Sequence, residues 1–267
     1  MRQQDLAVII LAAGKGTRMR SSLAKVLLPL AGHPLLKYVL DLSYHLKPAR
    51  TIVVVGHQAD QVKSTFSDHD VEFVVQHEQL GTGHAAQQAQ EKLKDFTGLV
   101  LILCGDMPLI RSQTLESLVR EHRKSEAKCT VLTLKSKASH DFGRIIRDVT
   151  GSVLKIVELK DASEAEKKVD EFNSGVYCFD NLLFFKALSC LDSDNAQQEY
   201  YLTDTVEYLV KKKYFVQAVQ TDDANEILGI NSPDDLNRAV RLLEGQPDSS
   251  SSRSEEHTSE LQSQSNL

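Results

Sequence analysis

The sequence lacks the cysteine pairs and the long apolar runs that would assign it to several common classes. Its four cysteines, among 267 residues, are widely spaced and form no C-x-x-C motif, which favours buried, reduced thiols. The first apolar run is about six residues long, too short for a signal peptide or a membrane span. We therefore expect a cytoplasmic protein with no membrane partner.

Positive charge is also scarce. The 31 Lys and Arg residues are outnumbered by 37 Asp and Glu residues, giving a formal net charge of −6. Residues 247–267 account for −3 of this charge, so the other 246 residues are also near −3. Because a nucleic-acid-binding protein would present a clustered basic face, we expect no nucleic-acid partner.

The C-terminal stretch has few apolar residues. Residues 247–267 contain the serine run Ser249–Ser252 and almost nothing that could pack into a core, so we expect this tail to be disordered. From about Ser252 onward the tail also resembles a translated sequencing-library adapter, which predicts an assembly artefact. The chain is 41% hydrophobic, and residues 1–246 are enough for one large α/β domain or two small ones.

The most informative stretch is Leu11–Met19, L-A-A-G-K-G-T-R-M, which follows the apolar run Leu6–Leu11. Small residues such as Gly14 let backbone N–H groups approach an anion closely. Arg18 and Lys25 add two positive charges, and the pattern is typical of a polyphosphate site. A simple turn with both cations in solvent would fit the same residues.

Two standard phosphate motifs are absent from this loop. Neither Lys15 nor Lys25 lies in the Walker A frame, which needs a glycine four residues before Gly-Lys-Ser/Thr. The dinucleotide pattern G-x-G-x-x-G fails because Met19 occupies the third glycine position. The sequence therefore indicates a phosphate loop of a third kind.

Strand and helix patterns alternate through the first half, about residues 1–124. Strands are predicted at 6–11, 51–55, 71–75 and 99–103, and helices at 34–46, 57–66, 82–94 and 112–124. Pro34 suits a first helical position. This alternation predicts an α/β fold with a doubly wound, mostly parallel, Rossmann-like sheet.

The second half, about residues 125–246, is predicted to form a mixed sheet built on the first half. Strands are expected at 130–134, 144–148, 153–159, 176–179 and 215–219, some with hairpin-like spacing, and a short one at 227–230. Helices are expected near 181–190 and 202–212, and a last one starting at the N-cap Ser232 and ending near Glu244.

Polar residues follow predicted strands at the sheet edge where ligands bind in open α/β folds. Asp106, preceded by Cys104 and Gly105, would offer a carboxylate oxygen to Mg²⁺, and Asn231 would offer a neutral amide oxygen. Each also fits a structural role, because Asp106 could cap the next helix and Asn231 precedes a helix cap.

Two further sets carry weaker signals. Gln76 with Gly81–Gly83 offers a planar amide and bare backbone that match the edge of a pyrimidine, although a surface turn would look the same. Gly143, Glu158 and Asn173 lie at strand ends in the second half, where polar groups and glycines suit sugar hydroxyls.

Taken together in chain order, these motifs are specific enough to indicate a protein family. The blocks are L-A-A-G-x-G-T-R-M, K-V-L, Q-x-E-Q-L-G-T-G-H-A, G-D-x-P-L, F-G-R-I, I-V-E-x-K-D-A, N-S-G, E-Y-Y-L-T-D and G-I-N, between Leu6 and Glu244. This order resembles the uridylyltransferase domain of bacterial N-acetylglucosamine-1-phosphate uridylyltransferases. The resemblance implies a nucleotidyltransferase fold and Mg²⁺-dependent transfer of UMP from UTP to N-acetylglucosamine 1-phosphate, in cell wall biogenesis and peptidoglycan synthesis.

The resemblance also implies a role for each matching residue. The uridine nucleotide would be held by Leu11, Ala12, Ala13, Gly14, Gln76, Gly81 and Thr82, and substrate would also meet Cys104, Gly105 and Asp106. The phosphates would meet the catalytic cations Arg18 and Lys25. Mg²⁺ would bind Asp106 and Asn231. The sugar would bind Gly143, Glu158 and Asn173 in a sugar-binding second half.

The sequence departs from the family at three points. Ala24 stands where the family usually has Pro, and Cys104 stands where many members have Tyr. No hexapeptide repeats of a C-terminal β-helix are present, so we expect no acetyltransfer from this sequence, and a homo-oligomer only where such a domain exists.

Two alternative functions stay open at this point. One is a nucleotidyltransferase for another sugar 1-phosphate or another nucleoside triphosphate. The other is a non-catalytic sugar-nucleotide-binding regulatory protein. The presence of Arg18, Lys25, Asp106 and Asn231 favours catalysis, because a sensor would be expected to lose at least one of them.

Overall fold

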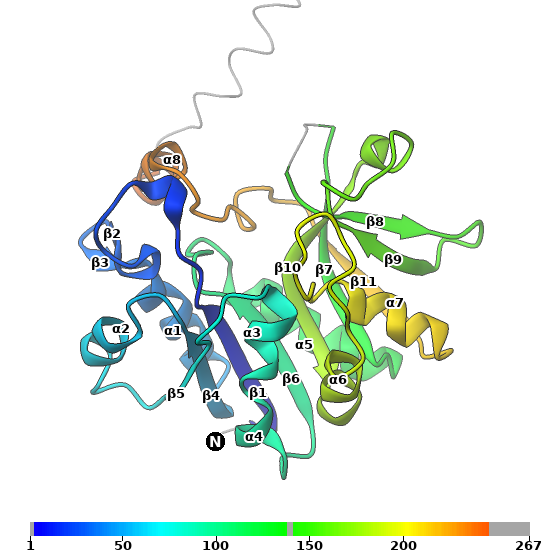
Figure 1. Cartoon of the computed structure of the whole chain (residues 1–267), viewed down its shortest axis with the longest axis horizontal. Helices are drawn as coiled ribbons and strands as arrows, with labels where there is room; N and C mark the ends of the chain where they lie inside the picture. The colour runs from blue at the N-terminus through cyan, green and yellow to red at the C-terminus, as the bar shows by residue number, and fades with distance from the viewer. Residues whose placement is uncertain (1–2, 138–140, 246–267) are drawn as a thin grey trace, which may run out of the picture.

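The computed structural model describes residues 3–137 and 141–245; the predicted tail lies outside them. Its main sheet has nine strands. They are β1 (Gln3–Ala12), β4 (Pro48–Val55), β5 (Glu72–Val75), β6 (Leu99–Cys104), β7 (Cys129–Lys135), β8 (Arg144–Arg147), β9 (Val153–Val157), β10 (Glu171–Asp180) and β11 (Val216–Thr221). The order is β11-β7-β10-β6-β1-β4-β5, with β8 and β9 attached beside β10 (Figure 1). The sheet is continuous through both predicted halves.

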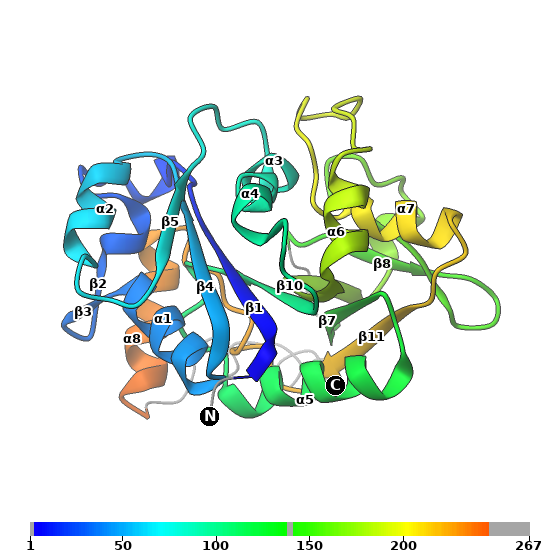
Figure 2. The same ribbon diagram turned by 90° about the horizontal axis from the view of Figure 1, so that it is seen from below.

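The helices form two layers around this sheet. They are α1 (Leu35–His45), α2 (Ala59–Thr65), α3 (Thr82–Gln87), α4 (Gln90–Leu93), α5 (Ser112–Ser125), α6 (Asn181–Leu188), α7 (Asp204–Lys211) and α8 (Pro233–Leu243). Figure 2 shows α1 and α5 on one side of the sheet and α3 and α6 on the other. This arrangement confirms the predicted doubly wound α/β fold.

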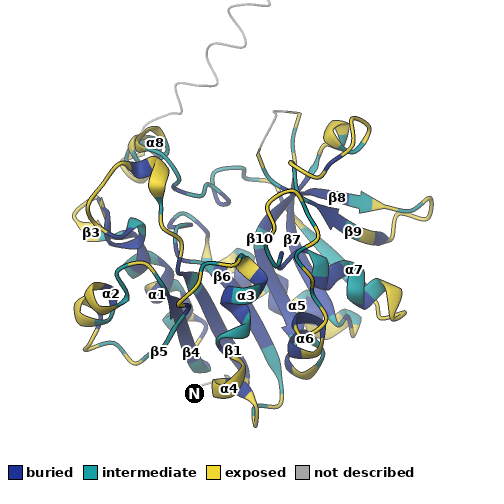
Figure 3. Ribbon diagram, in the orientation of Figure 1, coloured by how far each residue is buried: buried dark blue, intermediate teal, exposed yellow. Residues whose placement is uncertain are grey.

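The alternating side chains of β1 explain the two layers. Val8 and Ile10 pack in the cluster that includes α1, α2 and α5. Ala7 and Ile9 pack in the cluster that includes α3, α4, α6 and α7. All four side chains are fully buried, as Figure 3 shows for the central strands. A strand buried on both faces is apolar throughout, which is why the run at Leu6–Leu11 was recognisable.

Strand direction changes between the halves. β1 pairs in parallel with β4 and β6, and β4 with β5, as the strand–helix alternation predicts. β10 pairs antiparallel with β6 and β7, β8 and β9 form an antiparallel hairpin, and β11 is parallel to β7. The predicted mixed sheet in the second half is therefore confirmed.

A small third cluster packs α8 beside residues 11–19, here called the opening loop. Met19, Leu30 and Leu35 pack with Ile230 and Ala239. This contact carries the residues just before α8 to the carboxyl ends of β1 and β6.

Three local predictions were wrong. The helix expected at 82–94 is divided into α3 and α4. The strand expected at 227–230 is instead a turn followed by irregular chain. Its apolar side chains are buried or half-buried, and the Ile230 N–H donates to Asp106 O at 2.9 Å. Pro34 lies in a short ribbon of β2 (Pro29–Leu30) and β3 (His33–Pro34), and α1 begins one residue later. Its ψ of 144° is extended rather than helical.

No helix in the two described stretches combines the length and the apolar character needed to cross a membrane.

Candidate functional site

The carboxyl ends of β1 and β6 form the floor of a pocket of about 540 Å³. Leu11 pairs with Cys104 at the end of the parallel ladder, and the Gly105 N–H donates to Leu11 O at 2.9 Å. This pocket brings together ten of the predicted residues: Leu11, Ala12, Ala13, Gly14, Lys25, Gln76, Gly81, Thr82, Cys104 and Asp106. Gly105 lies between two of them.

The opening loop passes close to Lys25. A side chain at Gly16 would place its Cβ 2.6 Å from Lys25 Cβ, and the φ of Gly16 is +61°. Glycine is required here for both reasons. The loop then enters the short helix η1 (Thr17–Met19), where Arg18 is exposed and is not part of the pocket wall. Of the two predicted catalytic cations, Lys25 therefore lines the pocket and Arg18 does not.

Lys25 lies against two oxygen atoms from distant parts of the chain. Its ammonium group forms an ion pair with Asp106 Oδ2 and donates to Asn231 Oδ1 at 3.2 Å. The side chains of Lys25 and Asp106 are only 13% and 18% exposed. The Asp106 and Asn231 oxygens therefore converge on one cationic centre.

The N-terminus of α8 orients Asn231. Asp235 Oδ2 accepts from the N–H of Asn231 at 2.9 Å and from the N–H of Ser232 at 2.8 Å. The Ser232 hydroxyl accepts from the Asp235 N–H, which completes a capping box. The predicted N-cap Ser232 and N1 Pro233 are confirmed, and the cap fixes the backbone from which the amide extends.

These two oxygens also form the donor set that the predicted magnesium site needs. Among the described residues, no group of three or more His, Cys, Asp or Glu side chains converges on a metal position. Mg²⁺ does not require such a cage, because it usually takes one or two protein oxygens together with phosphate oxygens and water. Asp106 and Asn231 therefore fit this ion.

Gln76 also lines the pocket, although it is almost fully buried. Its Nε2 donates to Gly81 O at 3.0 Å and lies 3.1 Å from His84 Nδ1. Gln79 Nε2 in turn donates to Gln76 O at 3.0 Å. The amide is thus held in place by the loop that it was predicted to act with.

The three predicted sugar residues lie close together on the second half, outside this pocket wall. The Asn173 N–H donates to Gly143 O at 2.9 Å, and a Cβ at Gly143 would lie 3.5 Å from Glu158 Oε2. Burial raises the pKa of Glu158, and the carboxylates of Asp161 and Glu199 raise it further. A hydrogen bond from a nearby threonine hydroxyl opposes this shift.

Cys104 lies between the two groups of residues. Its thiol is 3.6 Å from Gly175 O, on β10 and two residues beyond Asn173. Burial, aided by the negative charge of Asp106, raises the pKa of the Cys104 thiol to about 12, so it stays protonated at neutral pH. Cys104 is therefore a packing and contact residue rather than a nucleophile.

The sequence did not single out seven residues of the pocket wall as binding residues: Lys15, Gly16, Thr17, Val26, Gln79, Ala85 and Glu199. Most of them adjoin a predicted residue in sequence. Glu199 is different, because it lies 93 residues beyond Asp106, the wall residue nearest to it in sequence. The block E-Y-Y-L-T-D was the only available signal for it.

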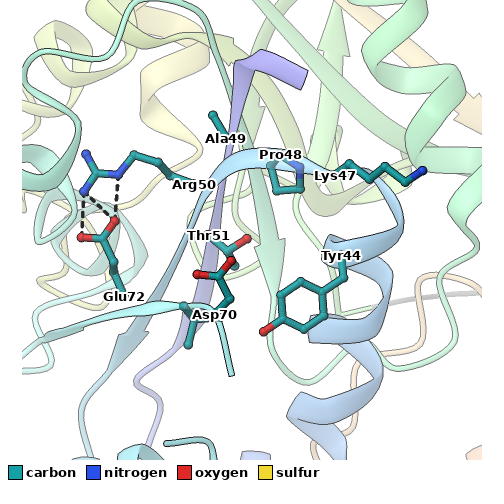
Figure 4. Close-up of a pocket in the computed structure, with 9 residues that line it drawn as sticks. Tyr44, Lys47, Pro48, Ala49, Arg50, Thr51, Asp70 and Glu72 are labelled. Atoms are coloured by element: carbon teal, nitrogen blue, oxygen red, sulfur yellow. Dashed lines mark hydrogen bonds and ion pairs between the residues drawn. The ribbon is translucent and has the colours of Figure 1, made fainter. Parts of the chain in front are cut away.

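A second pocket, of about 380 Å³, lies at the opposite edge of the sheet, where β4 and β5 begin (Figure 4). It holds none of the predicted site residues. Its Arg50 is engaged by Glu72, with Nε donating to Oε1 at 2.8 Å and Nη2 donating to Oε2 at 2.7 Å. In open α/β sheets ligands bind at the carboxyl edge, which favours the first pocket.

Fold and pocket together define a nucleotidyltransferase-type α/β domain. The chain belongs to the MobA-like NTP transferase domain family, whose model matches residues 8–174. It is 45% identical over 235 residues to the "Bifunctional protein GlmU" of Bacillus subtilis, covering 88% of this chain and 51% of that protein. It is 46% identical over 241 residues to the protein of that name in Pelobacter propionicus, covering 90% and 52%. The chain thus spans about half the length of these curated relatives.

Solved structures agree on the fold. A UDP-glucose pyrophosphorylase complexed with UDP-glucose has a TM-score of 0.73 and 16% identity, covering 90% of this chain and 98% of that one. A putative glucose-1-phosphate thymidylyltransferase from Bacillus anthracis has a TM-score of 0.71 and 19% identity, covering 89% and 94%. At these identities the likeness supports the architecture alone.

Proposed function

We propose that this chain transfers UMP from UTP to N-acetylglucosamine 1-phosphate, forming UDP-N-acetylglucosamine and pyrophosphate. The observation that carries the proposal is the single pocket in which the opening loop, Gln76, Gly81, Lys25 and Asp106 meet. The resemblance of its motifs to the uridylyltransferase family and its identity to the GlmU proteins support the same function. The proposal includes a cytoplasmic role in supplying cell wall synthesis.

The reaction needs charge neutralisation more than it needs a base. A sugar phosphate has a second pKa near ~6, so it is largely a dianion at neutral pH and can attack without a general base. Its approach to a triphosphate brings negative charges together. Lys25 and the N–H groups around Gly14 would stabilise the charge that develops, and Arg18 would meet the phosphates from η1.

Asp106 and Asn231 would hold Mg²⁺, because their oxygens already converge on the ammonium of Lys25. When bound, the ion would neutralise charge on the triphosphate. Lys25 would leave these two oxygens to the ion and contact the same phosphates. On the other side, Glu158 and Asn173 would orient the sugar, so that its phosphate faces the pocket.

One experiment tests this function. The protein is incubated with Mg²⁺, each of the four nucleoside triphosphates and a panel of sugar 1-phosphates, and pyrophosphate release is measured. We expect release with UTP and N-acetylglucosamine 1-phosphate, and its loss when the ion is chelated. Release with a different pair would identify a different nucleotidyltransferase. No release with any pair would support the non-catalytic sensor.

A further inference from the structure

Residues 76–83 of the first half, here called the base loop, contain the residues assigned to the uridine base, and a short segment of the second half lies against them. Residues 199–203, here called the bridging segment, follow α6 and run beside the start of α3 (Figures 1 and 2). The Tyr200 N–H donates to Leu80 O, and the Gly83 N–H donates to Tyr200 O, both at 2.8 Å. The loop with Gly81 is thus paired to the bridging segment through backbone groups.

The glycines of the loop make this pairing possible. A Cβ at Gly81 would lie 2.6 Å from Tyr200 O, and a Cβ at Gly83 would lie 2.9 Å from the same oxygen. Real side chains do not tolerate such contacts with backbone. The two glycines therefore serve the contact with the bridging segment as well as leaving space for a ligand.

Two threonine hydroxyls extend this contact in both directions. Thr82 Oγ1 accepts from the Leu202 N–H at 3.0 Å, so its acceptor oxygen is used within the protein. The Thr203 hydroxyl donates to Glu158 Oε1 at 3.1 Å. Because Gln76 Nε2 donates to Gly81 O, three hydrogen bonds, linked through the backbone at residues 81–82 and 202–203, join Gln76 to Glu158.

The bridging segment is also held by residues of the second half. Asp161 accepts from the Ala196 N–H at 2.8 Å and from the Tyr201 hydroxyl at 3.2 Å. Asn195 Oδ1 accepts from the Glu199 N–H at 3.2 Å. The segment is thus hydrogen-bonded on both sides, and packed, hydrogen-bonded networks of this kind are the physical routes that can carry coupling between two sites.

We infer that Thr82 and Thr203 are positioning residues that couple nucleotide binding at the base loop to sugar phosphate binding at Glu158. This inference rests on the proposed function and adds a coupling between its two substrates. Ordering of the loop by the nucleotide places Glu158 for the sugar phosphate, and the effect is reciprocal, because coupling between two binding equilibria is symmetric.

Calorimetry tests the coupling without turnover. The dissociation constant of N-acetylglucosamine 1-phosphate is measured with Mg²⁺, with and without α,β-methylene-UTP, whose bridging carbon prevents UMP transfer. In the unmodified protein we expect the analogue to tighten sugar phosphate binding about 5-fold or more. Thr82→Val and Thr203→Val should each reduce this factor to about 2-fold or less, whereas Thr82→Ser, which keeps the hydroxyl, should retain it.

The exposed Thr65 provides a matched control, because its hydroxyl bonds only to Gln61 O on its own helix, among the contacts of the described residues. Thr65→Val should leave the coupling unchanged. If both ligands bind but their affinities are independent, or if Thr82→Val and Thr203→Val keep full coupling, the inference is overturned and the proposed function stands. If the analogue does not bind at all, the proposed function fails and the inference fails with it.

Discussion

At the scale of single residues, Lys25 is the group whose surroundings say most about chemistry. Its ammonium is shared between Asp106 and Asn231, so before Mg²⁺ binds it is held at the two oxygens that are assigned to that ion. Its side chain is only 13% exposed, and a positive charge that is largely shielded from water contributes strongly when a reaction develops negative charge beside it. An exposed charge such as Arg18 is screened by water in the chain alone.

We predict that Lys25→Ala and Arg18→Ala each lower turnover by at least ~10-fold and raise the KM for the sugar phosphate by a smaller factor. The reason is that both cations would act on the triphosphate and not on the sugar. Steady-state kinetics with varied sugar phosphate measures the two constants. Lys37→Ala is the control, because this lysine pairs with Asp41 on the exposed side of α1 and should leave both constants unchanged. Near-normal turnover in both Lys25→Ala and Arg18→Ala would contradict the assigned role.

At the scale of elements, the sequence predicted those helices and strands that are determined by local residue patterns, and it failed where tertiary packing determines the conformation. The alternation of buried strands and amphipathic helices is a local pattern, and it identified nearly every element of the main sheet. The misses have tertiary causes: residues 227–230 are apolar like a strand but reach no ladder, and α3 stops at Gln87 although its composition favours a longer helix.

The candidate site divides in the same way. Residues on the opening loop and after β6 were predictable because the carboxyl ends of neighbouring parallel strands must meet. Asn231 was assigned only through the family resemblance, since the packing of α8 that brings it to Lys25 leaves no local pattern. Glu199 was missed because the bridging segment reaches the pocket through backbone pairing with residues 80–83, which composition does not encode.

The cap of α8 allows a prediction at this scale. Asp235→Ala should lower the free energy of unfolding by about 1 kcal/mol, because it removes the acceptor for the N–H groups of Asn231 and Ser232. It should also weaken Mg²⁺ binding in the presence of α,β-methylene-UTP, since Asn231 loses its orientation. Urea unfolding and calorimetry measure the two effects. Asp234→Ala, at an exposed neighbouring acid, is the control, and equal metal affinity in both variants would contradict the link.

At the scale of the whole molecule, the buried His122 and the half-buried Asp204 make stability depend on pH in opposite directions. Burial lowers the pKa of His122 from 6.5 to about 4, with its ring beside the hydroxyl of Thr130 at 2.8 Å. Burial, together with nearby carboxylates such as Glu207, raises the pKa of Asp204 from 3.8 to about 6. As pH falls below 6.5, the unfolded chain takes up a proton at His122 before the folded protein does, so stability is lost. Over the same range the folded protein takes up a proton at Asp204 first, so stability is gained.

The two contributions can be separated by substitution, which gives the last prediction. Between about pH 7 and about pH 4, the stability of His122→Gln should rise relative to the unmodified protein by up to about 3 kcal/mol, because the unfavourable proton uptake at this site is removed. Asp204→Asn should lose stability relative to the unmodified protein over the same interval. Urea unfolding at several pH values measures both differences in the free energy of unfolding. A loss of stability that is the same at every pH in either variant does not affect how these differences change with pH. Parallel stability profiles for all three proteins would show that neither group controls the response to acid.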